Sequence, residues 1–180
     1  MFSSLIYAFY TFTSETSNLV IETANLDFEI NQNDFDVGFI DKELIVPGDE
    51  LINSPNVVNI VNKSTISSCL RLIIRIKIDD ITYYLSDVDN EIIGVMSNGW
   101  TYDTTDECWY YLGVNGSISP PTDIDNPTKI NILESLRING NYFGNSIASK
   151  NVEVTIIFQA KQHDFVSWQN IGELNKNLGN

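Results

Sequence analysis

The side chains that most often carry catalysis are scarce in this chain. It holds one histidine, His163, and two cysteines, Cys69 and Cys108. A cysteine nucleophile needs a base within hydrogen-bond distance, and His163 can in principle serve either cysteine, but no motif places these residues together. The chain has no H-E-x-x-H, no G-x-S-x-G and no glycine-rich phosphate loop. We therefore predict a structural or solvent-facing histidine, no cofactor and no enzyme activity.

The two cysteines lie far apart in the sequence and have different neighbours. Their spacing is neither that of zinc ligands nor that of a redox motif. They can form a disulfide or remain as buried thiols, and the sequence leaves both alternatives open.

Acidic residues gather in three predicted loops and raise the question of a calcium site. The loops contain Asp87, Asp89, Asn90 and Glu91; Asp103, Asp106 and Glu107; and Asp123 and Asp125. The first loop has Ile92 where an EF-hand needs glycine, so we favour solvated loops and predict no metal site. Carboxylates near Trp100 and Trp109 also fit a carbohydrate groove, although aromatic residues beside turns in a β protein more often close its core.

Composition and charge restrict the fold class and the partners. The chain of 180 residues has 24 Ile, 12 Val, 12 Thr and 20 aromatic residues but only 4 Ala, a mixture that favours strands over helices. The net charge of −14 would repel a nucleic-acid backbone and an anionic membrane, so neither is an expected partner.

Apolar residues alternate with polar ones in several segments that are separated by turn signals such as Asn98-Gly99 and Pro120-Pro121. The clearest strands are predicted over residues 26–30, 70–78 and 152–160, with one side of residues 70–78 facing water, and others over 57–62, 81–85, 92–96, 109–112 and 129–138. We predict an all-β, jelly-roll-like antiparallel sandwich of eight or more strands. Apolar residues spaced three or four apart from Phe165 to Leu178 indicate a short C-terminal helix.

The N-terminal segment is apolar and strand-like, and it precedes a polar connector that ends at Asn18. Its residues are Leu5, Ile6, Tyr7, Ala8, Phe9, Tyr10, Thr11 and Phe12. The segment is shorter than the roughly 20 residues of a membrane span, and no Lys or Arg precedes it as in a signal peptide. Such a strand can complete the sheet of a neighbouring copy, and head-to-tail contacts of this kind propagate into filaments. We therefore divide the chain into a donor strand with its connector, residues 1–18, and a sandwich domain, residues 19–180.

Several segments, in the same order, resemble secreted biofilm-matrix fibre proteins of the TasA and camelysin type, and in character the BsaA-like pilins. The matching segments are residues 8–17 with 21–28, Val46-Pro47-Gly48-Asp49 with residues 58–64, Trp109-Tyr110-Tyr111, and residues 144–146 with 154–162. Asn25 departs from the family's pattern, which has glycine before the first strand.

The resemblance implies a non-enzymatic subunit of an extracellular fibre, located at the cell surface or in the biofilm matrix, with no membrane segment in the mature form. Its partners would be further copies of itself in a head-to-tail homopolymer, together with minor or anchoring subunits. The resemblance also implies a spontaneous amide bond between subunits. Lys63, Lys77 and Lys161 are the candidate nucleophiles, Asn18, Asn59 and Asn62 the acceptors and Glu153 the promoting carboxylate. A monomeric secreted β-sandwich that binds carbohydrate or calcium is the alternative.

Overall fold

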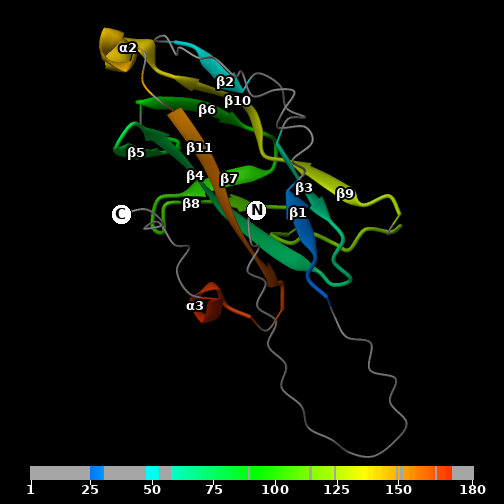
Figure 1. Cartoon of the computed structure of the whole chain (residues 1–180). Coiled ribbons are helices and arrows are strands. Elements are labelled where there is room, and N and C mark those ends of the chain that lie inside the picture. The colour runs from blue at the N-terminus through cyan, green and yellow to red at the C-terminus, as the bar shows by residue number, and fades with distance from the viewer. Residues whose placement is uncertain are drawn as a thin grey trace, which may run out of the picture.

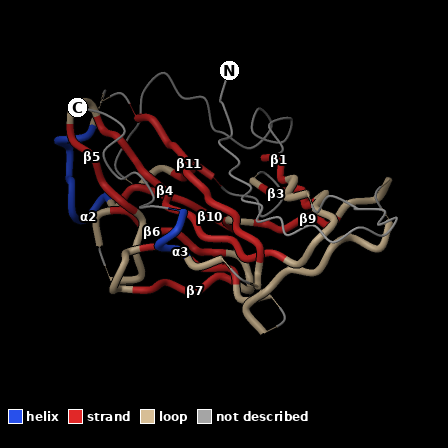
Figure 2. Tube along the Cα trace, turned by 90° about the horizontal axis from the view of Figure 1, so that it is seen from below, coloured by secondary structure: helices blue, strands red, loops and turns tan. Residues whose placement is uncertain are grey.

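The structure is a computed structural model that describes residues 25–30, 48–52, 58–88, 90–113, 115–123, 125–148, 150, 152–164 and 166–171. Within these residues the chain forms eleven strands, and every pair of neighbouring strands is antiparallel (Figures 1 and 2). The prediction of an all-β antiparallel sandwich with eight or more strands is confirmed.

The larger sheet has the order β11-β4-β8-β7, and β5 pairs with the second half of β4. Its strands are β4 (Ser68–Ile78), β5 (Ile81–Tyr84), β7 (Trp100–Asp103), β8 (Cys108–Tyr111) and β11 (Val152–Gln162). Strands β4 and β11 pair over their full lengths and form the long ladder that crosses the centre of Figure 1.

Two smaller sheets form the opposing layer. One is made of β1 (Phe28–Ile30), β3 (Asn59–Asn62) and β9 (Thr128–Asn131), and the other of β2 (Glu50–Ile52), β10 (Leu133–Ile138) and β6 (Ile92–Met96). Ile132 lies between β9 and β10, where its N–H donates to the carbonyl of Val58 and its own carbonyl accepts from Ser97, both at 2.9 Å. The predicted strand over residues 129–138 is therefore two strands joined at Ile132.

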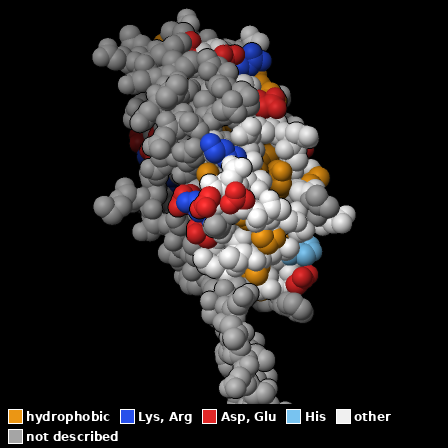
Figure 3. All heavy atoms as spheres, turned by 90° about the vertical axis from the view of Figure 1, so that its right-hand side faces the viewer, with side chains coloured by type: hydrophobic (Ala, Val, Ile, Leu, Met, Phe, Trp, Pro, Cys, Tyr) orange, Lys and Arg blue, Asp and Glu red, His pale blue; other side chains and the backbone are white. Residues whose placement is uncertain are grey.

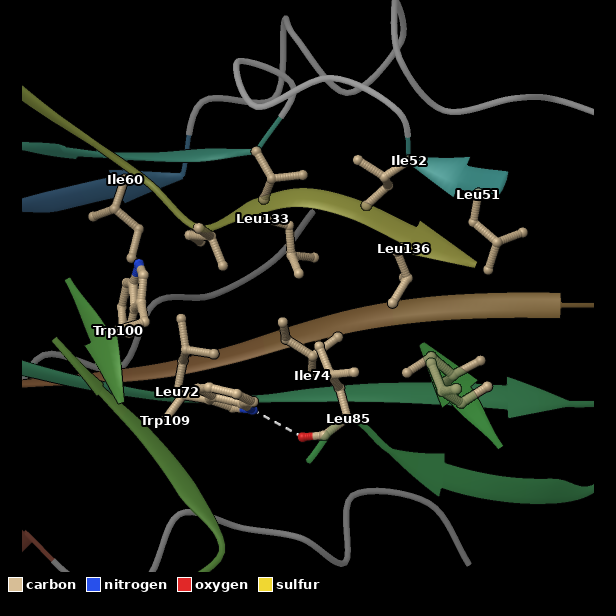
Figure 4. Packing of buried hydrophobic residues seen from close by; sticks show 14 of the residues in the cluster. Leu51, Ile52, Ile60, Leu72, Ile74, Leu85, Trp100, Trp109, Leu133 and Leu136 are labelled. Atoms are coloured by element: carbon tan, nitrogen blue, oxygen red, sulfur yellow. Dashed lines mark hydrogen bonds between the residues drawn. The ribbon is translucent and has the colours of Figure 1, made fainter. Parts of the chain in front are cut away.

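The core fills the space between the two layers. The even-numbered residues of β4, Leu70 to Ile76, are completely buried and face apolar residues of the opposing layer (Figure 4). The opposing residues include Ile52, Ile60, Leu133 and Leu136, all with no exposed surface. The period-two pattern of the sequence thus selects the face of β4 that is buried against the second layer.

The outer face of β4 differs from the prediction. We expected it to face water. Lys77 is exposed as expected, but Arg71 is only 6% exposed and Ile73 only 2%. Ile73 packs with Cys108, Tyr84, Tyr110 and Ile157 in a second, smaller apolar cluster. The prediction was wrong here because other parts of the chain cover this face, which local alternation of residues does not reveal.

Short helical segments complete the described chain. Asn139 caps the single turn of α2 (Gly140–Phe143), which continues into the 3-10 turn η1 (Gly144–Ile147), and α3 (Trp168–Ile171) lies at another end of the molecule (Figure 1). The predicted C-terminal helix is present as the one turn of α3, and the rest of its pattern lies outside the described residues. Among the described helices, none has the length and apolar character needed to cross a membrane.

Candidate functional site

A groove of about 750 Å³ lies on the outer side of the larger sheet. One wall is the β7–β8 hairpin, the other is the segment around α3, and β4 contributes residues between them. Its lining is mixed in character: aromatic Tyr102, Tyr110, Tyr111 and Trp168, charged Asp103 and Lys161, and the pair Cys69 and His163.

The groove brings Cys69 and His163 together. Cys69 is an odd-numbered residue of β4, so its side chain leaves the sheet on the outer face. His163 directly follows β11, and its N–H donates to the carbonyl of Ser67 at 2.9 Å. The result is a distance of 3.3 Å between Cys69 Sγ and His163 Nδ1, with the Gly116 carbonyl 3.2 Å from the same sulfur.

No sequence motif indicated this pair, because it depends on the register between β4 and β11. In that register Lys161 lies directly opposite Cys69. His163 follows two residues later, just after the end of β11, and therefore lies beside the Cys69 sulfur. The second cysteine, Cys108, lies elsewhere on the outer face, and both cysteines are buried. Of the two alternatives left open by the sequence, the structure has buried thiols and no disulfide between them.

Burial raises the pKa of the Cys69 thiol, and the nearby Asp164 carboxylate acts in the same direction. The ammonium of Lys161 opposes this rise in the pKa through its charge and a hydrogen bond. Because burial is the largest of these effects, the sulfur is a protonated thiol at neutral pH.

Lys161 is itself a buried cation, with 9% of its surface exposed. Its Nζ lies 3.4 Å from the carbonyl oxygens of Gln162 and His163, and 5.3 Å from the ring centre of Trp168. No carboxylate of the described residues lies within ion-pair distance of this ammonium. Within the described structure its charge is therefore balanced by dipoles and an aromatic ring rather than by an anion.

Arg71 anchors α3 to the sheet next to this site. Its guanidinium donates two hydrogen bonds to Gln159 Oε1, at 2.9 and 2.7 Å, and lies 3.2 Å from Asp106 Oδ2. The ring centre of Trp168 is 4.6 Å from the guanidinium carbon. Tyr110 hydrogen-bonds to Asp106, and burial followed by this bond raises the pKa of Tyr110 to about 12. These contacts explain how a charged side chain is buried on a face predicted to be wet.

The aromatic and acidic residues of the alternative binding site have structural partners. Trp100 and Trp109 are each 8% exposed. The indole N–H of Trp100 donates to the carbonyl of Asn131, and that of Trp109 to the carbonyl of Leu85 (Figure 4), both at 2.8 Å. The prediction that they close the core is confirmed, and a carbohydrate platform built on these two residues is wrong.

Carboxylates of the acidic loops accept hydrogen bonds from backbone N–H groups of the same loop. Asp103 accepts from the backbone N–H of Thr105 at 2.8 Å, and Asp123 accepts from that of Asp125 at 3.0 Å. Within the described ranges no group of three or more His, Cys, Asp or Glu side chains could share a metal ion. On the face shown in Figure 3, acidic and basic side chains lie next to each other rather than in separate blocks.

The residues considered for an amide bond between subunits are spread over both layers. Lys63 Nζ forms an ion pair with Glu29 at 2.7 Å. Lys77 of β4 lies opposite Glu153 of β11, and both side chains are exposed, whereas a promoting carboxylate is expected to be buried.

The two described acceptors, Asn59 and Asn62, are buried in β3. Asn62 donates to the carbonyl of Ser119 at 3.1 Å and accepts from the N–H of Ser64 at 2.9 Å. The side-chain amide of Asn62 is therefore already bonded within its own subunit. Asn18 and the predicted donor strand, residues 5–12, lie outside the described residues.

The outer edge of β11 is the second feature relevant to function. Strand β11 pairs with β4 through residues 152–162, and in the described part of the chain no strand pairs with its other edge. Its core-facing side chains are only half-buried, whereas their register partners on β4 are completely buried. The half-buried residues and their partners are Val154 and Ile76, Ile156 and Ile74, Phe158 and Leu72, and Ala160 and Leu70.

Comparison with known proteins identifies no relative: no family model matches the chain, and neither a curated protein nor a solved structure is significantly similar to it.

Proposed function

We propose that the chain is a non-enzymatic structural subunit of an extracellular fibre, in which residues 5–12 of one copy pair with the outer edge of β11 in the next copy. The observation that carries the proposal is the contrast between the half-buried core-facing side chains of β11 and their fully buried partners on β4. A further strand beside β11 would cover these side chains and bond to the outer edge.

The dimensions of the donor segment fit this edge. Eight extended residues span about 26 Å, and the eleven residues of β11 span about 36 Å. Alternate donor side chains would point into the core, so either Leu5, Tyr7 and Phe9 or Ile6, Ala8, Tyr10 and Phe12 could cover Ile156 and Phe158.

The remaining edges of the described sheets are less suited to a donor. Strands β1 and β2 each have three residues, β5, β7 and β9 have four, and β6 has five. A short edge offers few main-chain hydrogen bonds, and folded proteins use short edge strands to limit such pairing. The long apolar edge of β11 is therefore the edge that most needs a cover.

Deletion of residues 1–12 tests the donor strand. We expect the full chain to form filaments visible by negative-stain electron microscopy and the truncated chain to remain monomeric. A peptide of residues 1–18 added to the truncated chain should raise its melting temperature, because it pairs with the outer edge of β11. It should not restore filaments, because the peptide is not attached to a sandwich domain that could accept the next strand.

Two matched substitutions serve as controls. Phe9→Asp in the donor strand should prevent assembly, whereas Ile81→Asp on β5, where the side chain is 60% exposed, should not. Filaments that persist unchanged after the deletion would refute the proposal. A monomeric full chain that is stabilised by calcium or by a carbohydrate would support the alternative function instead.

Covalent linkage between subunits is tested separately. Boiling the filaments in detergent and reductant should leave a ladder of oligomers on a gel if amide bonds join the subunits. The variants Lys63→Arg, Lys77→Arg and Lys161→Arg then identify the nucleophile, because arginine keeps the charge but forms no amide bond. Monomer alone on the gel removes the covalent link and leaves the donor-strand mechanism intact.

A further inference from the structure

We propose that Cys69 is a site of reversible thiol–disulfide exchange with small disulfides that carry a carboxylate, in which Lys161 binds the carboxylate and His163 accepts the thiol proton. This inference does not rest on donor-strand pairing, because it concerns side chains on the outer face beside α3. It shares Lys161 with the proposed amide bond between subunits, and the two roles exclude each other at this residue.

The geometry favours Cys69 over the other thiol of the chain. Cys69 lines the shallow groove of about 750 Å³, and its sulfur has a histidine nitrogen at 3.3 Å. Cys108 also forms no disulfide, but its sulfur lies 3.2 Å from the carbonyl of Asp106 and packs against Ile73, and it does not line the groove. Cys108 therefore serves as an internal control of similar burial.

Lys161 indicates the charge of the ligand. A buried ammonium is costly unless it is paired, and this one has two carbonyls at 3.4 Å, the Trp168 ring and the Cys69 sulfur as neighbours, none of them an anion while the thiol is protonated. A carboxylate in the groove would give Lys161 a charge-assisted hydrogen bond that the described residues do not provide. Tyr110 and Trp168 meet edge to face on the outer side of the sheet and suit a ligand with an apolar body beside its charged group. The other two tyrosines of the lining, Tyr102 and Tyr111, pack against the tryptophans of the core instead.

The reaction is balanced without a further oxidant. Sulfur of Cys69 attacks one sulfur of the small disulfide, a new bond forms between them, and the original sulfur–sulfur bond breaks. Nδ1 of His163 takes the thiol proton, and the released thiolate takes it up in turn. Cys69 is oxidised to a mixed disulfide, and the departing half of the ligand is reduced to a thiol.

The ammonium of Lys161 also stabilises the thiolate form of Cys69. A thiolate forms as the proton leaves, and the ammonium next to it stabilises that charge, as the lowering effect of Lys161 on the pKa of Cys69 indicates. Because burial still raises this pKa overall, the exchange rate should increase with pH beyond neutrality rather than reach a plateau below it.

Two chromogenic disulfides test the proposal on the full chain: the anionic dithiobis(nitrobenzoate) and the neutral dithiodipyridine. In the native protein we expect Cys108→Ser to retain a fast reaction with the anionic reagent, and Cys69→Ser to react at least about tenfold more slowly through Cys108. Equal rates in these two variants would overturn the proposal.

The role of Lys161 is read from the ratio of the two rates, anionic over neutral reagent. Lys161→Met should lower this ratio about tenfold, which corresponds to about 1.4 kcal/mol, and Lys161→Arg should largely restore it. An unchanged ratio in Lys161→Met would refute carboxylate recognition by this residue. Nitrobenzoate, which carries the carboxylate but no disulfide, provides a test without substitution at Lys161. It should slow the reaction of Cys69 in the Cys108→Ser protein, and the inhibition should saturate. An absence of inhibition would also refute carboxylate recognition.

Discussion

Two isoleucines that face each other across the β4–β11 ladder provide a sharp test of the open sheet edge. Ile74 and Ile156 are register partners and both contribute to the core, but Ile74 has no exposed surface and Ile156 is only half-buried. The same substitution, isoleucine to alanine, can therefore be compared at two positions that differ mainly in what covers them.

The expected costs follow from burial. Removing a fully buried isoleucine side chain to alanine costs about 2–5 kcal/mol, part of it from the cavity that remains. We expect about 4 kcal/mol for Ile74→Ala and about 2 kcal/mol for Ile156→Ala, because solvent already reaches the latter side chain and little cavity forms. Both values apply to the chain that lacks residues 1–12.

Equilibrium unfolding in urea measures both values, with the slope of the transition as a check that the compactness of the unfolded state is unchanged. A second measurement with the peptide of residues 1–18 should increase the cost of Ile156→Ala, since the added strand covers this side chain, and leave that of Ile74→Ala unchanged. If the two substitutions cost the same in the truncated chain, β11 is already covered by its own chain and the reasoning fails.

Three further outcomes are expected. Gly94→Ala should destabilise the fold by about 1–3 kcal/mol in urea unfolding, because a Cβ atom there would lie 2.6 Å from Leu85, and Leu85→Val in the same chain should recover part of the loss. Trp109→Phe should lower stability by about 1–3 kcal/mol in the same assay by leaving the buried Leu85 carbonyl without its 2.8 Å donor; an unchanged midpoint would contradict this. Finally, stability should fall as the pH rises from about 10 to about 12, because the unfolded chain loses the Tyr110 proton that the folded chain keeps, and Tyr110→Phe should show a smaller fall.

Much of the fold could be predicted from the residues. The low alanine content and the abundance of β-branched residues indicated strands, and the alternation in residues 70–78 and 152–160 identified the two longest ones and the face of each that enters the core. These features are local, because side chains point alternately to the two faces of any strand. The turn signals separated the strands for the same reason, since glycine, proline and asparagine act on the backbone at their own positions.

The candidate site could not be predicted in this way. Cys69, Lys161 and His163 meet only because β4 and β11 pair in one particular register. Arg71 is buried because Gln159, Asp106 and Trp168, from distant parts of the chain, surround it. Strand pairing between distant segments depends on which edges remain available once the core has packed, and no short window of sequence contains that information. The sequence by itself determined which segments are strands and which of their faces are apolar. The tertiary structure decided which strands are neighbours, and thereby which side chains share the groove.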